Sequence, residues 1–353
     1  MAYWNIKNVA VRGVTGTVPN HPFSTYDFPF FTREDAETFN NTVGIKNRYF
    51  APDTMCASDM CQDAGERLIE ALGWDKSSID VLLFTSVTQD YKTPPTSAIL
   101  QDRMGLPTTT FVLDVPMGCC GCIYSIVVAG NLLTAGTTKR AILLIGDTAA
   151  RMGNANDKSR MPLFGDSGTA VALEYDPTAT DICIDFNTLG SGYEALMTPH
   201  GGYRHPIDKA TSFIEEDFGN GIIRAPKDAL INGMDVFSFA ITRPSLSVKK
   251  MMDEWQLDKD TDVDYFLIHQ ANKLIVDRLV KKLKLSPEKV PYNLQEFGNL
   301  GGASIPMLMS SEIAESLRAR PLSLICSSFG LGLTWATMWL RTQPMVVVDV
   351  HKL

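Results

Sequence analysis

Strand-like and helix-like segments alternate along the whole chain, and this alternation limits the possible folds more than any other feature of the sequence. Short runs rich in branched and aromatic residues predict strands at 81–86, 110–114, 140–146 and 169–174, then at 265–268, 322–326 and 333–340. Helical patterns cover 123–133, with Gly136 as a plausible stop, and 272–283. The sequence therefore indicates an α/β architecture.

The chain of 353 residues is long enough for about two domains. A polar segment at 176–181 predicts a boundary, which gives an N-terminal half at 1–176 and a C-terminal half at 177–353. Each half contains a strand that leads into a turn and then a helix, so a duplication is suggested. The longest apolar runs, 141–145 and 345–348, are strand-sized, so we expect no membrane span and a cytoplasmic protein.

The chain is acidic, with a net charge of −8, which argues against nucleic-acid binding. It has seven cysteines, and three of them lie between 119 and 122. A cluster of this kind in a long chain favours catalysis or metal binding over a disulfide framework. Because zinc sites usually need two separated ligand pairs and the other cysteines form no second close pair, we expect no metal site.

Cys119 is the candidate nucleophile. It follows a predicted strand and opens a predicted helix, where unpaired backbone N–H groups and the helix dipole favour a thiolate and should lower the thiol pKa. Gly118 and Gly121 leave room for a substrate carbonyl beside it. The alternative is that the cysteines are small buried hydrophobic residues, and for Cys120 and Cys122 that interpretation is preferred.

Other polar residues also stand where strands end. His269 follows the strand 265–268, a position that often faces a site in open α/β sheets, although a lone histidine is more often structural. Asn299 lies in a glycine-rich turn, where it could simply stabilise its own backbone. The glycine-rich segment 329–335 does not open a βαβ unit, so it predicts a strand-joining turn with exposed N–H groups and not a dinucleotide site. The segment 165–168 imitates a serine-protease loop but lacks a companion histidine motif.

Together and in this order, these motifs resemble one family, β-ketoacyl-acyl-carrier-protein synthase III and its relatives. The resemblance runs from Val43-Gly-Ile-Lys-Asn-Arg48 through Asp114–Cys122, Leu163–Asp166 and Gly190–Tyr193. It continues through His269-Gln-Ala-Asn272 and Gly298-Asn299 to Phe329–Trp335. It implies a thiolase-like fold, two similar α/β halves in a five-layered αβαβα sandwich, usually as a homodimer.

The resemblance also implies catalytic roles. Cys119, five residues after Asp114, matches the family's nucleophile, His269 its catalytic histidine and Asn299 its catalytic asparagine. The implied reaction needs no cofactor: an acyl group is held on Cys119, a malonyl thioester loses carbon dioxide, and the resulting enolate attacks the acyl group. The backbone N–H groups of Cys119 and Leu331 are the implied oxyanion hole. If the turn at Leu331 required φ > 0, leucine would cost about 1 kcal/mol or more.

Several departures from the family concern the substrate. Thr38 and Thr42 occupy the positions of a tryptophan and an arginine that clamp coenzyme A, so delivery of the acyl group on a carrier protein is favoured. Thr93 aligns with a bulky pocket-gating residue and, with Phe329, is expected to line an acyl pocket for longer chains. An acidic carrier protein needs a basic landing site, and the helix after His269 offers one with Lys273, Arg278, Lys281 and Lys282.

Two alternatives remain open at this point. The chain could transfer its acyl group to an oxygen or nitrogen nucleophile without decarboxylation, or it could be a non-catalytic subunit that only binds acyl chains. The presence of both Cys119 and His269 favours an enzyme. The expected activity is therefore a decarboxylating condensation in fatty-acid or specialised acyl-chain biosynthesis.

Overall fold

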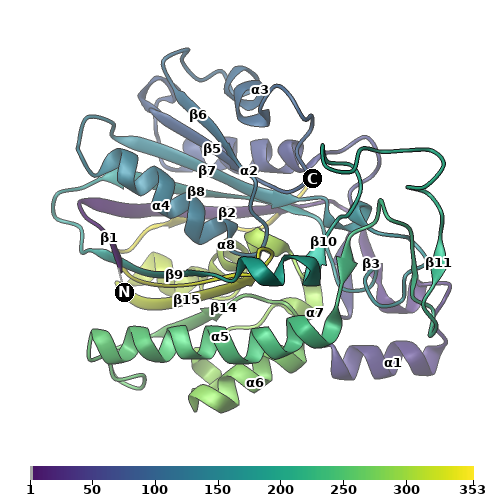
Figure 1. The fold of residues 1–353 in the computed structure, drawn as a ribbon. Helices are drawn as coiled ribbons and strands as arrows, with labels where there is room; N and C mark the ends of the chain where they lie inside the picture. The colour runs from purple at the N-terminus through teal and green to yellow at the C-terminus, as the bar shows by residue number, and fades with distance from the viewer. Residues whose placement is uncertain (1–2) are drawn as a thin grey trace.

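Two large sheets form the centre of the molecule, as the computed structural model of residues 3–353 shows (Figure 1). The first sheet has the order β17-β2-β8-β7-β5-β6, and β18 also pairs with β2. Its strands are β2 (Val9–Val18), β5 (Val81–Thr85), β6 (Phe111–Val115), β7 (Arg140–Asp147), β8 (Ser167–Tyr175), β17 (Val346–Val347) and β18 (His351–Lys352). The second sheet has the order β1-β9-β16-β15-β14. Its strands are β1 (Trp4–Ile6), β9 (Ile182–Thr188), β14 (Tyr265–Ile268), β15 (Leu322–Gly330) and β16 (Thr334–Thr342).

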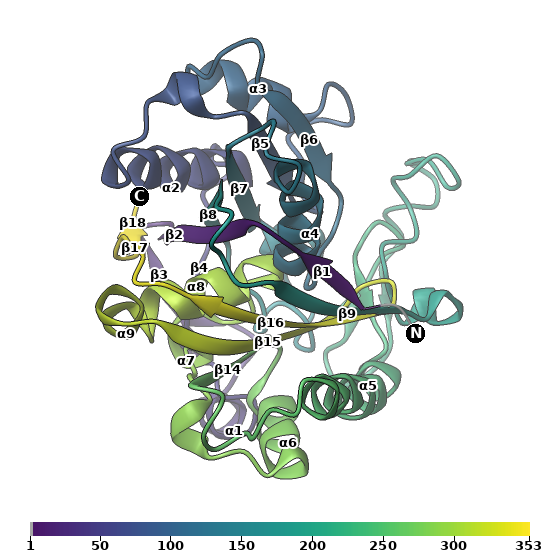
Figure 2. The same cartoon turned by 90° about the vertical axis from the view of Figure 1, so that its left-hand side faces the viewer.

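Helices cover both sheets and fill the space between them, which gives five layers (Figure 2). The outer face of the first sheet packs against α2 (Ala57–Ala71) and α3 (Thr96–Arg103). The helices α4 (Gly121–Leu133), α8 (Ser304–Ser311) and α9 (Ala314–Ala319) share one hydrophobic core with the facing sides of the two sheets. The outer face of the second sheet packs against α5 (Gly233–Glu254) and α6 (Lys273–Leu283). The expected five-layered αβαβα arrangement is confirmed.

The remaining elements are short and lie near one end of the sheets. They are α1 (Arg33–Thr42), α7 (Leu294–Phe297), the 3-10 turn η6 (Gly301–Ala303), and the strand pairs β3 (Pro22–Ser24) with β4 (Asn47–Tyr49), β10 (Leu196–Met197) with β13 (Leu230–Ile231), and β11 (Glu216–Asp217) with β12 (Ile223–Arg224). Strands such as β5 and β7 are buried almost throughout because helices cover both faces of their sheet.

The expected strands and helices are all present, with ends that differ by a few residues. The helix expected at 123–133 begins two residues earlier, at Gly121, and the strand expected at 322–326 continues to Gly330 because it forms a long hairpin with β16. The polar segment 176–181 lies between β8 and β9, where the chain passes from the first sheet to the second. The terminal strands belong to the sheet of the other half of the chain. The N-terminal strand β1 joins the second sheet, and the C-terminal strands β17 and β18 join the first. The division into two domains stays a prediction.

Within residues 3–353, no helix combines the length and the apolar character needed to cross a bilayer.

Candidate active site

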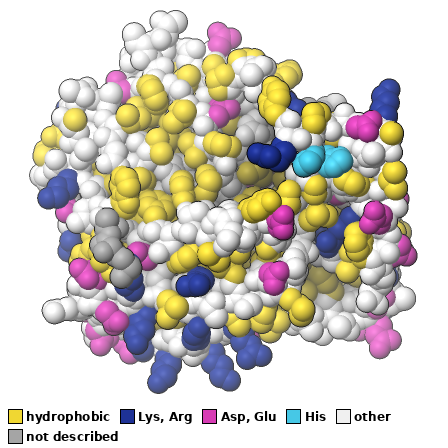
Figure 3. All heavy atoms as spheres, in the orientation of Figure 1, with side chains coloured by type: hydrophobic (Ala, Val, Ile, Leu, Met, Phe, Trp, Pro, Cys, Tyr) yellow, Lys and Arg dark blue, Asp and Glu magenta, His cyan; other side chains and the backbone are white. Residues whose placement is uncertain are grey.

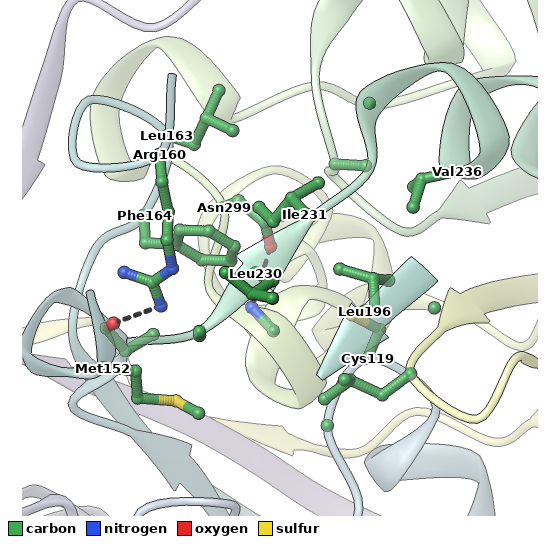
Figure 4. A pocket seen from close by; sticks show the side chains of 18 of the residues that line it. Cys119, Met152, Arg160, Leu163, Phe164, Leu196, Leu230, Ile231, Val236 and Asn299 are labelled. Carbon is green, nitrogen blue, oxygen red and sulfur yellow. Dashed lines mark hydrogen bonds between the residues drawn. The ribbon is translucent and has the colours of Figure 1, made fainter. Parts of the chain in front are cut away.

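A cavity of about 380 Å³ opens where the ends of β7 and β14 meet the turn before α4 (Figure 4). Cys119, His269, Asn299, Phe329 and Leu331 all line it. The structure therefore brings together the three residues expected to carry the chemistry. Most of the remaining wall is apolar, as is usual for sites that bind small acyl ligands. It includes Met152, Leu163, Phe164, Leu196, Leu230, Ile231, Val236 and Phe237.

Cys119 lies in the turn between β6 and α4, directly before the helix cap Cys120. Glycines on two sides make room for it. A side chain at Gly330 would place its Cβ 2.5 Å from the Cys119 sulfur, and one at Gly118 would meet Leu331 at the same distance. The position of Cys119 is thus set by packing, because no side chain forms a hydrogen bond to its sulfur within residues 3–353.

The expectation that the helix start lowers the pKa of Cys119 is wrong. Burial raises the pKa of the Cys119 thiol to about 11, although the backbone N–H groups of Leu331 and Cys119 act in the opposite direction. The nearby Asp147 carboxylate raises it further. Because α4 begins at Gly121, the thiol lies outside the first turn, and loss of hydration outweighs the helix terminus. At neutral pH the group is therefore a thiol, and its proton must leave during reaction.

Leu331 lies in the turn that joins β15 and β16, so the predicted strand-joining turn is confirmed. The leucine does not have a positive φ; Gly332 takes that conformation, with φ +136°. The expected strain at Leu331 is therefore absent, because the neighbouring glycine adopts the backbone geometry that leucine avoids. The N–H of Leu331 acts on the Cys119 sulfur, where it lowers the pKa of the thiol.

His269 follows β14 and is 1% exposed. Its Nδ1 lies 3.0 Å from the hydroxyl of Ser304, at the start of α8, and its ring meets the edge of Phe329 with centroids 5.4 Å apart. Burial lowers the pKa of His269 to about 4, so the imidazole is neutral at physiological pH. If Ser304 donates to Nδ1, the ring proton resides on Nε2.

Asn299 is fixed by its backbone and by its own side chain. Its N–H donates to Leu163 and its carbonyl accepts from the N–H of Gly165, which ties the asparagine turn to the loop before β8. Its Oδ1 accepts a hydrogen bond of 2.9 Å from the N–H of Gly301. With the oxygen engaged, the amide nitrogen is the atom left to interact with a ligand.

The sequence analysis missed three charged residues of the cavity wall, Asp147, Arg160 and Arg224. Arg224 is held by Asp157 and Ser159, both at 2.8 Å. Arg160 donates to the carbonyl of Ala149 at 2.8 Å, and burial lowers its pKa to about 10. Asp147 is the last residue of β7, and His269 directly follows β14. Because polar residues at the ends of such strands often face a site, the same pattern that marked His269 could have marked Asp147. Arg160 lies in no helix or strand, and Arg224 ends the two-residue strand β12, which the sequence did not predict.

Other expected site residues lie outside the cavity. Thr93 is exposed in the loop before α3 and does not line the cavity, so its gating role stays a prediction. Thr38 and Thr42 are exposed on α1. The expected docking residues are on α6: Arg278, Lys281 and Lys282 are exposed, whereas Lys273 pairs with Asp277. Between residues 3 and 353, no group of three potential metal ligands occurs.

Comparison with known proteins agrees with this geometry. A crystal structure of 3-oxoacyl-(acyl-carrier protein) synthase from Burkholderia xenovorans LB400 is 31% identical and superimposes with a TM-score of 0.92, covering 100% of this chain and 99% of that one. The chain belongs to the 3-oxoacyl-[acyl-carrier-protein] synthase III family. Models of the family's C-terminal region and of its synthase III region match residues 254–342 and 113–190, respectively.

Two more members of the synthase III family extend the comparison. A β-ketoacyl-[acyl-carrier-protein] synthase III from Streptococcus pneumoniae (strain Hungary19A-6) is 28% identical over 345 residues, which cover 96% of this chain and 99% of that protein. The synthase III structure from Pseudomonas aeruginosa PAO1 is 24% identical with a TM-score of 0.83, and at that identity it supports the fold alone. Residues 191–253, which fall between the two matched models, supply Leu196, Leu230, Ile231 and Val236 to the cavity wall.

Proposed function

We propose that this chain catalyses a decarboxylating condensation of an acyl group, held on Cys119, with a malonyl thioester, giving a β-ketoacyl thioester. One observation carries the proposal: Cys119, His269 and Asn299, from three separate parts of the chain, line one mostly apolar cavity. Membership of the synthase III family agrees with it. The product would enter fatty-acid or specialised acyl-chain synthesis, and the reaction needs no cofactor.

In the first step, the Cys119 sulfur attacks the carbonyl carbon of an acyl thioester. The carbonyl oxygen gains negative charge, and we assign its stabilisation to the backbone N–H groups of Cys119 and Leu331, which both lower the pKa of the Cys119 thiol. The acyl group then remains on Cys119 as a thioester. Its chain extends along the apolar wall, where Met152, Leu196 and Phe329 exclude water.

In the second step, the malonyl thioester enters the acylated site and loses carbon dioxide. The electrons of the broken carbon–carbon bond form an enolate, whose oxygen needs hydrogen-bond donors. A neutral His269 with its proton on Nε2, and Asn299 with its Oδ1 already engaged, both present N–H groups and no negative charge. The enolate carbon then attacks the acyl group and releases the Cys119 thiolate.

The acyl carrier protein is the proposed partner in both steps, and α6 is its proposed landing site. Lysine and arginine side chains gather along the lower edge of Figure 3, where α5 and α6 lie in Figure 1. Ala271, Asn272 and Ile275, at the start of this helix, line the cavity, so a carrier on the basic face would deliver its thioester nearby. Charge reversal of Arg278 and Lys281 should raise the KM for carrier-bound substrate and leave small thioester analogues unaffected.

We also propose a homodimer in the cytoplasm. Strand β6 pairs only with β5 in the described chain, and it exposes Phe111 (47%) and Leu113 (38%) at the edge of the sheet. Hydrophobic side chains gather over this edge and the neighbouring α4 in Figure 3. An apolar patch on an open strand edge favours association with a second copy. A reducing compartment would keep the Cys119 thiol free.

The test is to incubate the full chain with a panel of acyl-CoA and acyl-carrier thioesters and to measure intact mass. We expect an acyl adduct that maps to Cys119. When malonyl-carrier protein is added, its malonyl group should lose carbon dioxide and the acyl group should leave Cys119 as part of a β-ketoacyl product. The matched control is Cys56→Ala, which changes a cysteine outside the cavity. Transfer of the acyl group only to oxygen or nitrogen acceptors would contradict the decarboxylating condensation. If no thioester formed an adduct, the chain would be a non-catalytic subunit.

A further inference from the structure

The cavity contains a carboxylate that the proposed mechanism does not use. Asp147, at the end of β7, is 4% exposed and lines the cavity with Cys119. Its Oδ1 accepts hydrogen bonds from the Ser86 hydroxyl at 2.9 Å, the Val87 N–H at 2.8 Å and the Thr88 hydroxyl at 3.2 Å. Three donors on one oxygen fix the orientation of the carboxylate.

The other oxygen, Oδ2, has no hydrogen-bond partner in the described chain, and it is not sealed from solvent. It lies beside a pair of glycines. A Cβ at Gly301 would be 3.1 Å from Oδ2, and a Cβ at Gly302 would be 2.8 Å from the carbonyl of Gly118, next to Cys119. Glycine at these two positions lets the backbone pack closely against both Asp147 and the Cys119 turn, and Asp147 and Cys119 line the same cavity. A buried carboxylate with one free oxygen in a cleft is a functional candidate.

The chemistry at Cys119 requires such a group. Because burial raises the pKa of the thiol to about 11, its proton must pass to a base as the sulfur attacks. His269 is poorly suited, since its pKa is lowered to about 4 and its Nδ1 is engaged by Ser304. The guanidinium groups of Arg160 and Arg224 are not bases. Asp147 is the remaining titratable group on the cavity wall.

We propose that Asp147 is the proton acceptor for Cys119 during acyl transfer, through a water molecule in the cavity. The S–H bond breaks as the sulfur bonds to the acyl carbon, and the proton passes through the water to Oδ2. The carbon–sulfur bond of the incoming thioester then breaks, and the leaving thiolate takes the proton back from Asp147. No oxidant or other reactant is consumed. The proposal rests on the proposed function only in taking Cys119 as the nucleophile.

The groups around Asp147 define its titration. Burial raises the pKa of Asp147 to about 6, and the hydrogen bonds to Oδ1 oppose this effect. The titratable neighbours are Cys119, Cys61 on α2, and Asp166 before β8, whose carboxylate accepts from the N–H groups of Ala51 and Ala150. Cys61 is fully buried, and burial raises its thiol pKa, so it stays neutral. Above about pH 6 Asp147 is ionised and able to accept a proton.

Alkylation of Cys119 by iodoacetamide tests this without any thioester. As a base, Asp147 should accelerate the wild-type reaction, and Asp147→Asn should slow it at least about tenfold at pH 7.5. The deficit should shrink toward pH 10, as the thiol ionises by itself. If Asp147 acted on Cys119 only through its negative charge, it would raise the pKa of the thiol. Asp147→Asn would then lower that pKa and make alkylation faster. A faster reaction, an unchanged rate, or a deficit that does not vary with pH would overturn the proposal.

The control is Asp90→Asn, which alters a half-buried carboxyl that accepts from Ser58 and lies outside the cavity. Thermal unfolding of each variant separates loss of the base from loss of the fold. Quench-flow acylation with an acyl-CoA should show the same pH-dependent deficit. If alkylation depends on Asp147 but no thioester acylates Cys119, the proposed function fails, and Asp147 stands as the base for the Cys119 thiol without a role in acyl transfer.

Discussion

Cys119, the proposed nucleophile, and the two proposed enolate donors are positioned by different kinds of contact. Cys119 is held by the backbone alone, in a turn packed against Gly330 and Leu331. His269 and Asn299 are each oriented by a further hydrogen bond: His269 shares one with the Ser304 hydroxyl, and Asn299 accepts one from the N–H of Gly301. Steric change should therefore damage acyl loading, and loss of hydrogen bonds should damage decarboxylation. The two half-reactions become separable by mutation.

Cys119→Ala gives the largest expected effect. Without the sulfur no acyl-enzyme can form, so intact mass after incubation with any acyl thioester should show no adduct, and condensation should fall by at least about 10⁴-fold, in line with loss of a nucleophile. Cys122→Ala, which changes a cysteine buried in the core outside the cavity, is the control. If Cys119→Ala still formed the adduct in wild-type yield, Cys119 would not be the nucleophile.

Asn299→Ala should separate the two half-reactions. Acyl loading should stay within about threefold of wild type, whereas carbon dioxide release from malonyl-carrier protein should fall by about 10²–10³-fold, as for loss of one oxyanion donor. Both steps can be followed on the same sample, by intact mass and by trapped carbon dioxide. Equal losses in both steps would mean that Asn299 serves the fold of the loop and not the enolate.

Gly330→Ala tests the steric side of the comparison. The added Cβ would lie 2.5 Å from the Cys119 sulfur, so the sulfur must move. We expect acyl loading to fall by about 10²-fold, the typical cost of displacing a reacting group by about 1 Å. Gly190→Ala, at a glycine with open space around it, is the matched control. A variant with normal loading would show that the Cys119 turn tolerates displacement.

Ser304→Ala should have the smallest effect. It removes one hydrogen bond to the His269 ring, worth about 0.5–1.5 kcal/mol, so decarboxylation should slow by about 2–10-fold while loading is unchanged. Because burial lowers the pKa of His269 to about 4, carbon dioxide release by enzyme acylated beforehand should stay flat from pH 8 down to pH 5.5 in wild type. A fall centred near the ordinary histidine pKa would show that the ring is not desolvated.

The local patterns predicted the α/β class and marked Cys119 as a candidate, whereas the thiolase-like fold and the roles of His269 and Asn299 came from the resemblance to the synthase III family. Residues 81–84 and 265–268 are continuous apolar runs within strands, and Cys119, His269 and Asn299 stand at turns near the ends of helices or strands. The pKa of Cys119 was predicted with the wrong sign because the helix terminus is visible in sequence and the depth of burial is not. Arg160 and the strands β10 and β13 were missed because tertiary packing alone brings them to the cavity.

The exchange of terminal strands has a consequence for biosynthesis. Strand β2 is formed by residues 9–18, yet its partners β17 and β18 are formed by residues 346–352. During synthesis on the ribosome, the edge of the first sheet beside β2 stays unpaired until residues 346–352 have been made. In the same way, β1 has no partner strand until β9 has been made. An open strand edge can pair with another chain, so the nascent protein is exposed to aggregation for most of its synthesis. Chaperones that cover such edges should therefore affect the yield of folded protein more than the stability of the folded state.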